Sequence, residues 1–373
     1  MLRALAALAL WACAAATAWS ADARAEPRFA LREGLPCSDC HVNRTGGGMR
    51  TAFGAVWAQT HLPTWRSSGA ADPQLGSSVH FGANLRLDHR TVLPARTSIQ
   101  GKQYATPASN SFDISEGNVY LRADLIPDAL SVYVDEVVAP EGASAREAFV
   151  LYSALPAGLY LKAGRFMLPY GLRIWDDTAF MRQQTGFNYA NQDLGVELGT
   201  TGKHWSAALS LSNGSLGGGD GNLAKQLTAT VGVFDSWWRL YASAAWNDTS
   251  VRDFPFQTVT GGLHGGVRLA RLTLLGSVDW IRGIGNPEIY DQLSLFTEAD
   301  FELWRGVHLR GRFEAFDPSR QIANNERDRF IAGLSWFPVQ FAELRLEYRK
   351  NRDIPQRPAG NADELLVQLH GFL

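Results

Sequence analysis

The feature that most constrains the fold is a repeated alternation of apolar and polar side chains from His80 onward, in segments of about ten residues. In one of the clearest segments, Leu344, Leu346 and Tyr348 alternate with the charged residues at 343, 345, 347 and 349. Successive side chains of a β-strand point to opposite faces, so one face is apolar and the other charged. About ten residues is also the length that a tilted strand needs to cross a bilayer. A soluble sandwich would place this charge in bulk water, so we favour a membrane barrel.

The connections between these segments are asymmetric. Short turns, as at 126–129 and 235–236, alternate with longer polar loops, as at 89–111 and 166–192. Bacterial outer-membrane barrels have short periplasmic turns, longer extracellular loops and an even number of strands. We therefore predict an all-β fold, an outer-membrane antiparallel β-barrel of about sixteen strands. The expected strands are 80–90, 112–125, 130–138, 145–154, 158–165, 193–200, 203–212, 223–235, 236–246, 258–269, 270–282, 290–303, 306–316, 326–337, 339–350 and 362–373.

Composition excludes several other classes of protein. Among the 373 residues, 46% are hydrophobic, 19% are charged, and the net charge is −2. A disordered chain would have fewer large apolar residues, and a nucleic-acid-binding domain would usually be clearly basic. No apolar run of about 18 residues follows the N-terminal region, which argues against a helical membrane protein.

The N-terminal 25 residues have the pattern of a secretory signal peptide. A short basic start is followed by an Ala/Leu-rich stretch over 4–18, and small residues at 19–25 offer a cleavage site. A spanning helix is the alternative, but the apolar run is too short for one. Removal of this segment would also remove Cys13 and leave a mature chain with Cys37 and Cys40.

Those two cysteines belong to a C-x-x-C-H motif formed by Cys37, Ser38, Asp39, Cys40 and His41. This spacing is typical of a c-type haem attachment site, in which both thiols bond the porphyrin and the histidine binds the iron. A zinc site would require further ligands, and a thioredoxin-like dithiol would require a βαβ frame that the sequence lacks. We predict one covalent haem c, attached to Cys37 and Cys40, with His41 as an axial ligand.

The sixth iron ligand is left open between two residues near the motif. Met49 follows a run of three glycines, and His61 ends an amphipathic stretch over 52–60. Methionine ligation would raise the reduction potential, whereas a second histidine would lower it. The alternatives are a packing role for Met49, a surface position for His61, an open iron, or a barrel histidine such as His80. The scattered histidines, including His264 and His370, form no ligand spacing.

Charged side chains on the inward face are expected to pair across neighbouring strands. Examples are Arg310, Arg312, Glu314, Arg345 and Glu347. The loop after residue 165 is long enough to fold into the barrel mouth as a constriction. We interpret its carboxylates as solvated surface groups, with attraction of a cation as the alternative: Asp176, Asp177 and Asp193.

The segment around the haem motif resembles the start of the fused monohaem cytochrome-porin outer-membrane proteins of the iron-oxidase type. Pro27, Phe29 and Ala30 precede the haem cysteines in the order found in that family. The stretch 166–199 is similar to segments of large anion-selective porins. The resemblance implies a monohaem plug joined to a barrel that passes electrons inward from extracellular ferrous iron. The glycine-rich stretch 43–50 departs from the family pattern.

These observations divide the chain into a signal peptide at 1–25, a monohaem plug domain at 26–75 and a porin-like barrel at 78–373. We predict outer-membrane electron transfer, with the haem domain at the periplasmic side or in the lumen. The expected partners are outer-membrane lipid, a periplasmic cytochrome or other carrier, and an extracellular donor or acceptor. Nucleic acid is not among them, and no hydrolytic or transferase site is visible. The alternative function is a solute-diffusing porin with a haem-containing plug.

Overall fold

The computed structural model describes residues 26–65, 69–71, 73–99, 102–140, 142–215, 218–248, 257–284, 291–354 and 357–373. The predicted signal peptide lies outside the described residues. Among the described helices, none combines the length and apolar character needed to cross a bilayer.

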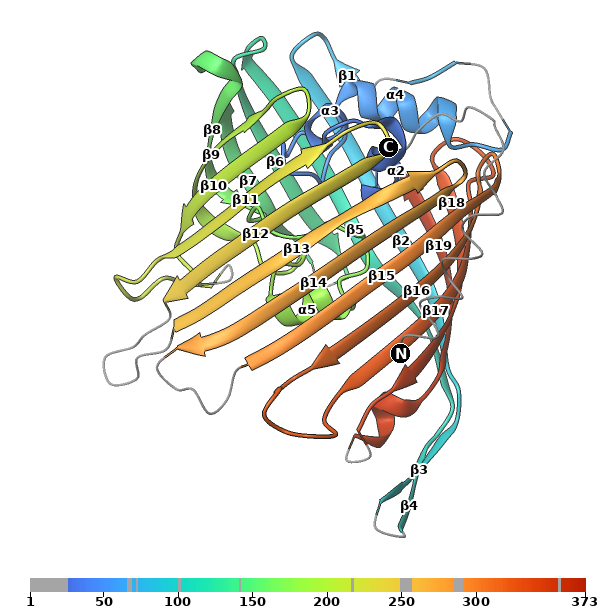
Figure 1. Cartoon of the computed structure of the whole chain (residues 1–373). Coiled ribbons are helices and arrows are strands. Elements are labelled where there is room, and N and C mark those ends of the chain that lie inside the picture. The colour runs from blue at the N-terminus through green and yellow to red at the C-terminus, as the bar shows by residue number, and fades with distance from the viewer. Residues whose placement is uncertain are drawn as a thin grey trace.

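Sixteen antiparallel strands form a closed barrel (Figure 1). Each strand pairs with its neighbour in sequence, and β19 closes the barrel by pairing with β2, with Leu369 opposite Leu87. This confirms the predicted fold and strand number. The strands are β2 (Val79–Val92), β5 (Ser109–Ile126), β6 (Leu130–Ala139), β7 (Ser144–Tyr152), β8 (Leu159–Phe166), β9 (Asp193–Thr201), β10 (Trp205–Ser212), β11 (Gln226–Phe234), β12 (Trp238–Asp248), β13 (Gln257–Leu269), β14 (Leu272–Ile284), β15 (Asp291–Trp304), β16 (Val307–Asp317), β17 (Arg327–Trp336), β18 (Ala342–Arg352) and β19 (Glu364–Phe372).

Three shorter strands lie outside this succession. β1 (Gln74–Leu75) pairs with the start of β2. β3 (Ala95–Ile99) and β4 (Lys102–Thr106) pair with each other in a two-stranded extension of the β2–β5 connection. This extension projects beyond the end of the barrel that carries the long connections (Figure 1).

The period-two alternation sets the inside and outside of the wall. On β18, Leu346 is 42% exposed on the outer face, whereas the neighbouring Arg345 is fully buried in the lumen. The inward charges pair across strands, as predicted: Arg310 lies 2.6 Å from Glu347, and Arg329 lies 2.8 Å from Glu314. The lumen wall along β15–β18 is therefore a lattice of matched charges, while the outer face is apolar.

The N-terminal segment occupies the end of the barrel that carries the short turns (Figure 1). It contains α2 (Pro27–Glu33), α3 (Cys37–Cys40) and α4 (Ala52–His61). The backbone amides of Thr64 and Trp65 donate to carbonyls of the β17–β18 turn at 2.8 and 3.0 Å. The Arg239 guanidinium donates to the Leu35 carbonyl at 3.1 Å. These bonds attach the segment to the rim and inner wall of the barrel.

Helix α2 is held against the lumen wall by ion pairs. Arg28 lies 3.0 Å from Asp300, and Arg32 lies 2.8 Å from Glu302, both on β15. The helix ends at Gly34, whose φ of +65° suits glycine. A Cβ at this position would lie 2.6 Å from the Cα atom of Ser236, so the close approach of helix and turn also requires glycine.

The connection between β8 and β9, residues 167–192, folds into the lumen as predicted and carries α5 (Phe180–Thr185). We call it the plug loop. Asp176 in this loop and Asp193 at the start of β9 are not solvated surface groups, which corrects our interpretation, whereas Asp177 is half-buried. Asp193 accepts from the Gly214 amide at 2.5 Å. Asp176 is buried and lies 2.9 Å from Arg312 and 3.1 Å from Arg349. Asp177 pairs with Arg182 at 2.9 Å. The loop therefore joins the charge lattice of the wall.

Apolar side chains connect the N-terminal segment, the plug loop and the wall. One cluster joins Phe29 and Trp57 to Phe337 and Phe372 on the rim and the last strand. Another joins Leu31 of α2 to Met181 of α5 and Phe296 of the wall. Two separate segments thus occupy part of the lumen and share its apolar and ionic contacts.

Candidate functional site

The residues of the C-x-x-C-H motif form one tight turn inside the barrel. Pro36 precedes α3, and the amide of His41 donates to the Cys37 carbonyl at 3.0 Å. His41 then pairs with Arg50 in an isolated antiparallel bridge. This bridge closes the intervening residues into a loop, so the motif is fixed at both ends.

The three glycines of that loop, Gly46, Gly47 and Gly48, all have positive φ. A Cβ on Gly46 would lie 3.3 Å from the Cβ of Cys37, and one on Gly48 would lie 2.6 Å from the Tyr133 hydroxyl. The glycine run therefore allows the loop to pass between the motif and the wall. The Arg173 guanidinium of the plug loop donates to the Gly46 carbonyl and links the two lumen segments.

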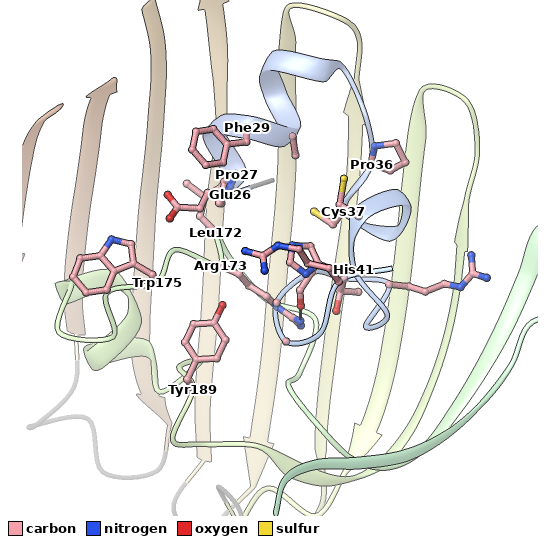
Figure 2. Close-up of a pocket in the computed structure, with 18 of the residues that line it drawn as sticks. Glu26, Pro27, Phe29, Pro36, Cys37, His41, Leu172, Arg173, Trp175 and Tyr189 are labelled. Atoms are coloured by element: carbon pink, nitrogen blue, oxygen red, sulfur yellow. Dashed lines mark hydrogen bonds between the residues drawn. The ribbon is translucent and has the colours of Figure 1, made fainter. Parts of the chain in front are cut away.

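A cavity lies beside the motif within the lumen. Cys37, Cys40 and His41 all line it, together with the three glycines. Figure 2 shows Cys37 and His41 on the N-terminal segment, near Arg173, with Trp175 and Tyr189 of the plug loop also bordering the cavity. The structure therefore brings the three predicted attachment residues together on one cavity wall.

Both cysteines are free thiols. Cys40 is 4% exposed, and burial, with a smaller contribution from Cys37 and Asp39, raises its pKa to about 12. Because this environment favours the neutral thiol, Cys40 is not itself an activated thiolate at neutral pH.

The charge of the cavity lining is unbalanced. Six arginines and three glutamates line it. Within the described ranges, four of these arginines have no carboxylate closer than 4.0 Å, which sets them apart from the arginines of the wall. These four are Arg44, Arg50, Arg173 and Arg239. Burial lowers the pKa of the guanidinium in the first three of them. An anionic occupant would relieve this excess charge.

Met49 is not among the residues that line the cavity, although Gly48 and Arg50 on either side of it are. Its side chain is 4% exposed and belongs to an apolar cluster with Val42, Tyr120 and Tyr133 in the barrel wall. The backbone amide of Met49 donates a hydrogen bond to the Tyr133 hydroxyl at 2.9 Å. Met49 packs against the wall, as in the packing alternative considered from the sequence.

His61 also lies outside the cavity lining. Its ring stacks on Trp57, with centroids 5.2 Å apart and planes at 7°. Its Nδ1 atom lies 2.9 Å from the Thr60 hydroxyl and 3.2 Å from the Trp57 carbonyl at the end of α4. The ring thus caps the helix end.

Two barrel histidines do line the cavity, and our sequence reasoning missed both: His264 on β13 and His370 on β19. His370 uses both ring nitrogens, with Nδ1 3.0 Å from Glu343 and Nε2 2.6 Å from Asn84. The Nδ1 atom of His264 is buried and has no hydrogen-bond partner among the described residues. Leaving such a group unpaired costs about 1–3 kcal/mol. Parity would have placed His264 in the lumen, because the adjacent Leu263 is 59% exposed.

The donor set fits a c-type haem. Two thiols and an imidazole at the required spacing share a cavity with an unpartnered buried imidazole nitrogen and an excess of guanidinium groups. Among the described residues, no cluster of three or more His, Cys, Asp or Glu side chains is arranged to hold a simple metal ion.

Comparisons with known proteins bear on the barrel alone. No protein-family model matches the sequence, and no curated protein matches it either. Among solved structures, an anion-selective porin from Comamonas acidovorans is similar over 79% of this chain and 99% of its own, with a TM-score of 0.59 and 11% identity. The outer membrane channel DcaP of Acinetobacter baumannii is similar over 81% of this chain and all of its own, with a TM-score of 0.58 and 10% identity. OmpF of Salmonella typhi is similar over 79% and 97%, with a TM-score of 0.58 and 10% identity.

The barrel has the porin fold. The similarity spans nearly the whole length of each porin but about four fifths of this chain. At this identity it establishes the architecture, whereas the chemistry of the site rests on the residues of this chain.

Proposed function

We propose that this chain is an outer-membrane electron-transfer protein in which Cys37 and Cys40 attach one haem c and His41 is its axial ligand. The observation that carries the proposal is the convergence of the complete C-x-x-C-H motif on a single cavity inside a porin-like barrel. When bound, a haem supplies a one-electron couple. The protein supplies the two thiols, an imidazole and a cavity with excess positive charge, which suits the two propionates.

The location of the motif favours contact with a periplasmic carrier. The N-terminal segment occupies the short-turn end, which faces the periplasm in outer-membrane barrels. A carrier that docks at this mouth would approach the segment directly. In each turnover an external donor, ferrous iron in the simplest case, loses one electron and the carrier gains one.

The plug loop determines how an external donor approaches. The bilayer core is about 30 Å thick, so a donor must enter the lumen from the long-loop end. There it would meet the plug loop, whose Trp175 and Tyr189 border the cavity (Figure 2). The Tyr189 ring lies under two guanidinium groups, 5.0 Å from Arg146 and 4.7 Å from Arg182. The plug loop thus contributes aromatic rings to the cavity lining that a donor would approach.

A solute-conducting porin with a haem-bearing plug is the second candidate function. It is favoured by the four arginines without carboxylate partners, which would also attract anionic solutes. In that case the lumen would have to stay open past the plug loop.

Proteoliposomes separate the two functions. The protein is produced with a c-type haem maturation system, and vesicles enclosing an oxidised periplasmic-type cytochrome are mixed with external ferrous iron. If the protein transfers electrons, vesicles with the wild type should reduce the enclosed cytochrome and vesicles with Cys37→Ser/Cys40→Ser should not. Both kinds of vesicle should swell at the same rate in solutions of small solutes. Equal reduction by both proteins, or no haem-stained band for the wild type on a denaturing gel, would refute the proposal. Vesicles that carry the protein and swell faster than protein-free vesicles, but do not reduce the cytochrome, would identify the porin function instead.

A further inference from the structure

The lumen contains one buried imidazole that the porin fold does not explain. His264 projects from β13 into the cavity and is only 4% exposed. Of the six barrel histidines, it is the one whose Nδ1 atom is buried without a hydrogen-bond partner in the described part of the chain. A nitrogen held in this way inside a cavity requires a partner that the protein itself does not provide.

The surroundings of His264 hold its ring in place. The ring stacks on Tyr241, with centroids 5.8 Å apart and planes at 6°. Its Nε2 atom lies 3.5 Å from the Ser243 hydroxyl oxygen. That oxygen also accepts from the amide of Gly171 in the plug loop at 3.3 Å, while its own hydrogen is donated to Thr230 at 3.0 Å. Ser243 is therefore an acceptor for an Nε2 hydrogen, which leaves the lone pair on Nδ1.

This arrangement is the one expected for a histidine that binds a metal. Metal-binding histidines use one ring nitrogen for the metal, and the other is oriented by a hydrogen-bond acceptor. The plug loop and α2 also pack closely against the strand on either side of the ring. Gly262 and Gly266 occupy the flanking lumen-facing positions, where a Cβ would lie 2.7 Å from the Tyr170 hydroxyl and 3.0 Å from a methyl group of Leu31. The glycines let the plug loop and α2 approach the strand on either side of His264.

We propose that His264 is the second iron ligand of the haem, beside His41, since both side chains line the same cavity. This inference rests on the proposed haem attachment and replaces the candidates near the motif, because neither Met49 nor His61 lines the cavity. It also assigns a role to the plug loop, which positions the ligand through Gly171 and Ser243. His370 is the matched control: it lines the same cavity, but both of its ring nitrogens already have partners.

The test is the spin state of the purified haem protein in detergent. The ferric wild type is expected to be low-spin, with the electron paramagnetic resonance and near-infrared signature of two imidazole ligands. His264→Ala is expected to keep its haem-stained band, become high-spin, and return to low-spin when imidazole is added. His264→Met should remain low-spin with a higher reduction potential. His370→Gln, Met49→Leu and His61→Gln should leave the spectrum unchanged.

The outcomes separate this inference from the function on which it rests. A low-spin bis-imidazole spectrum that persists in His264→Ala, or a high-spin wild type, would overturn the assignment of His264 and leave the haem attachment intact. Absence of covalent haem from the wild type would overturn both. If His264→Ala fails to assemble, the wild-type spectrum together with the potential of His264→Met decides the question, because an unchanged potential in that variant contradicts the ligation.

Discussion

Two regions of the lumen use arginine in opposite ways. Along β15–β18 the guanidinium groups are matched: Arg345 lies 2.8 Å from Glu343, and Arg349 lies 2.8 Å from Glu347. In the cavity, most of the arginines have no carboxylate partner among the described residues, for example Arg50. Carboxylates pair with the arginines of the wall, whereas in the described part of the chain only three glutamates line the cavity beside its six arginines.

The contrast separates the charges of the wall, which are paired within the protein, from those of the cavity, which a bound anion could neutralise. Buried ion pairs with good geometry leave no net charge for a ligand to neutralise. The pairs of the wall attach the N-terminal segment and the plug loop to the barrel, as with Arg28 and Asp176. An unmatched guanidinium in a confined cavity is costly, and the cost is recovered when an anion such as a propionate binds. The cavity is therefore the part of the lumen in which most arginines are unmatched among the described residues.

The largest effect is expected from breaking a matched pair of the wall. Arg310→Leu removes one of the two guanidinium groups that pair with the buried Glu347 carboxylate, at 2.6 Å, while Arg349 remains at 2.8 Å. We expect a loss of about 3 kcal/mol in the free energy of unfolding, the low end for breaking a buried ion pair. Urea unfolding in lipid vesicles measures it. The double variant Arg310→Leu/Glu347→Leu should recover most of the loss, and a double variant as unstable as the single one would contradict the pairing.

A smaller effect is expected where the plug loop joins the matched wall. Burial alone would raise the pKa of Asp176, but Arg349 and Arg312 outweigh it and hold the pKa well below its ordinary range. A lowered pKa in the folded state stabilises the docked loop above the ordinary aspartate pKa of about 3.9, and this stabilisation is lost as the pH falls below that value. Limited proteolysis of the loop should therefore be slow and constant from pH 8 to 5 and accelerate below about pH 4.

Asp176→Asn is the control for this pH dependence. It removes the titrating group, so cleavage should be faster at neutral pH, by the equivalent of about 1–3 kcal/mol, and nearly independent of pH. The same acceleration below pH 4 in Asp176→Asn and the wild type would show that another group controls the loop.

The smallest effect is expected from an unmatched arginine of the cavity. Arg50→Met removes a guanidinium that contacts the Phe372 ring at 4.5 Å and has no carboxylate partner within the described ranges. In the haem-free barrel we expect a change of less than about 1 kcal/mol in unfolding free energy. In the haem-loaded protein, loss of a positive charge should lower the reduction potential, because the free energy of reduction becomes less favourable by on the order of 1 kcal/mol.

Potentiometric titration measures that shift, and Arg50→Lys, which keeps the charge, is the matched control. A potential that falls equally in Arg50→Lys would show that shape rather than charge is responsible. A strong destabilisation of haem-free Arg50→Met would remove the distinction between the two regions.

Two side chains are buried because segments distant in sequence meet in the lumen. Phe337 lies in a short turn at the rim, yet it is 3% exposed and packs on Phe29 with ring centroids 6.2 Å apart. Asp176 reads as a loop carboxylate, but it is buried between two arginines of the wall. In the first case the N-terminal segment covers a residue of the rim, and in the second the plug loop carries its own carboxylate into the lumen.

The sequence alone determined the barrel, because its period-two alternation acts locally and each strand reveals its own inward and outward faces. It also determined the attachment motif, whose chemistry depends on five consecutive residues, Cys37 to His41. Only the tertiary structure decided which wall residues share the cavity with that motif. Parity places His264 and Arg239 in the lumen, but their height and neighbours depend on how the strands stagger when β19 closes on β2. That stagger is a property of the closed barrel, and no local pattern encodes it.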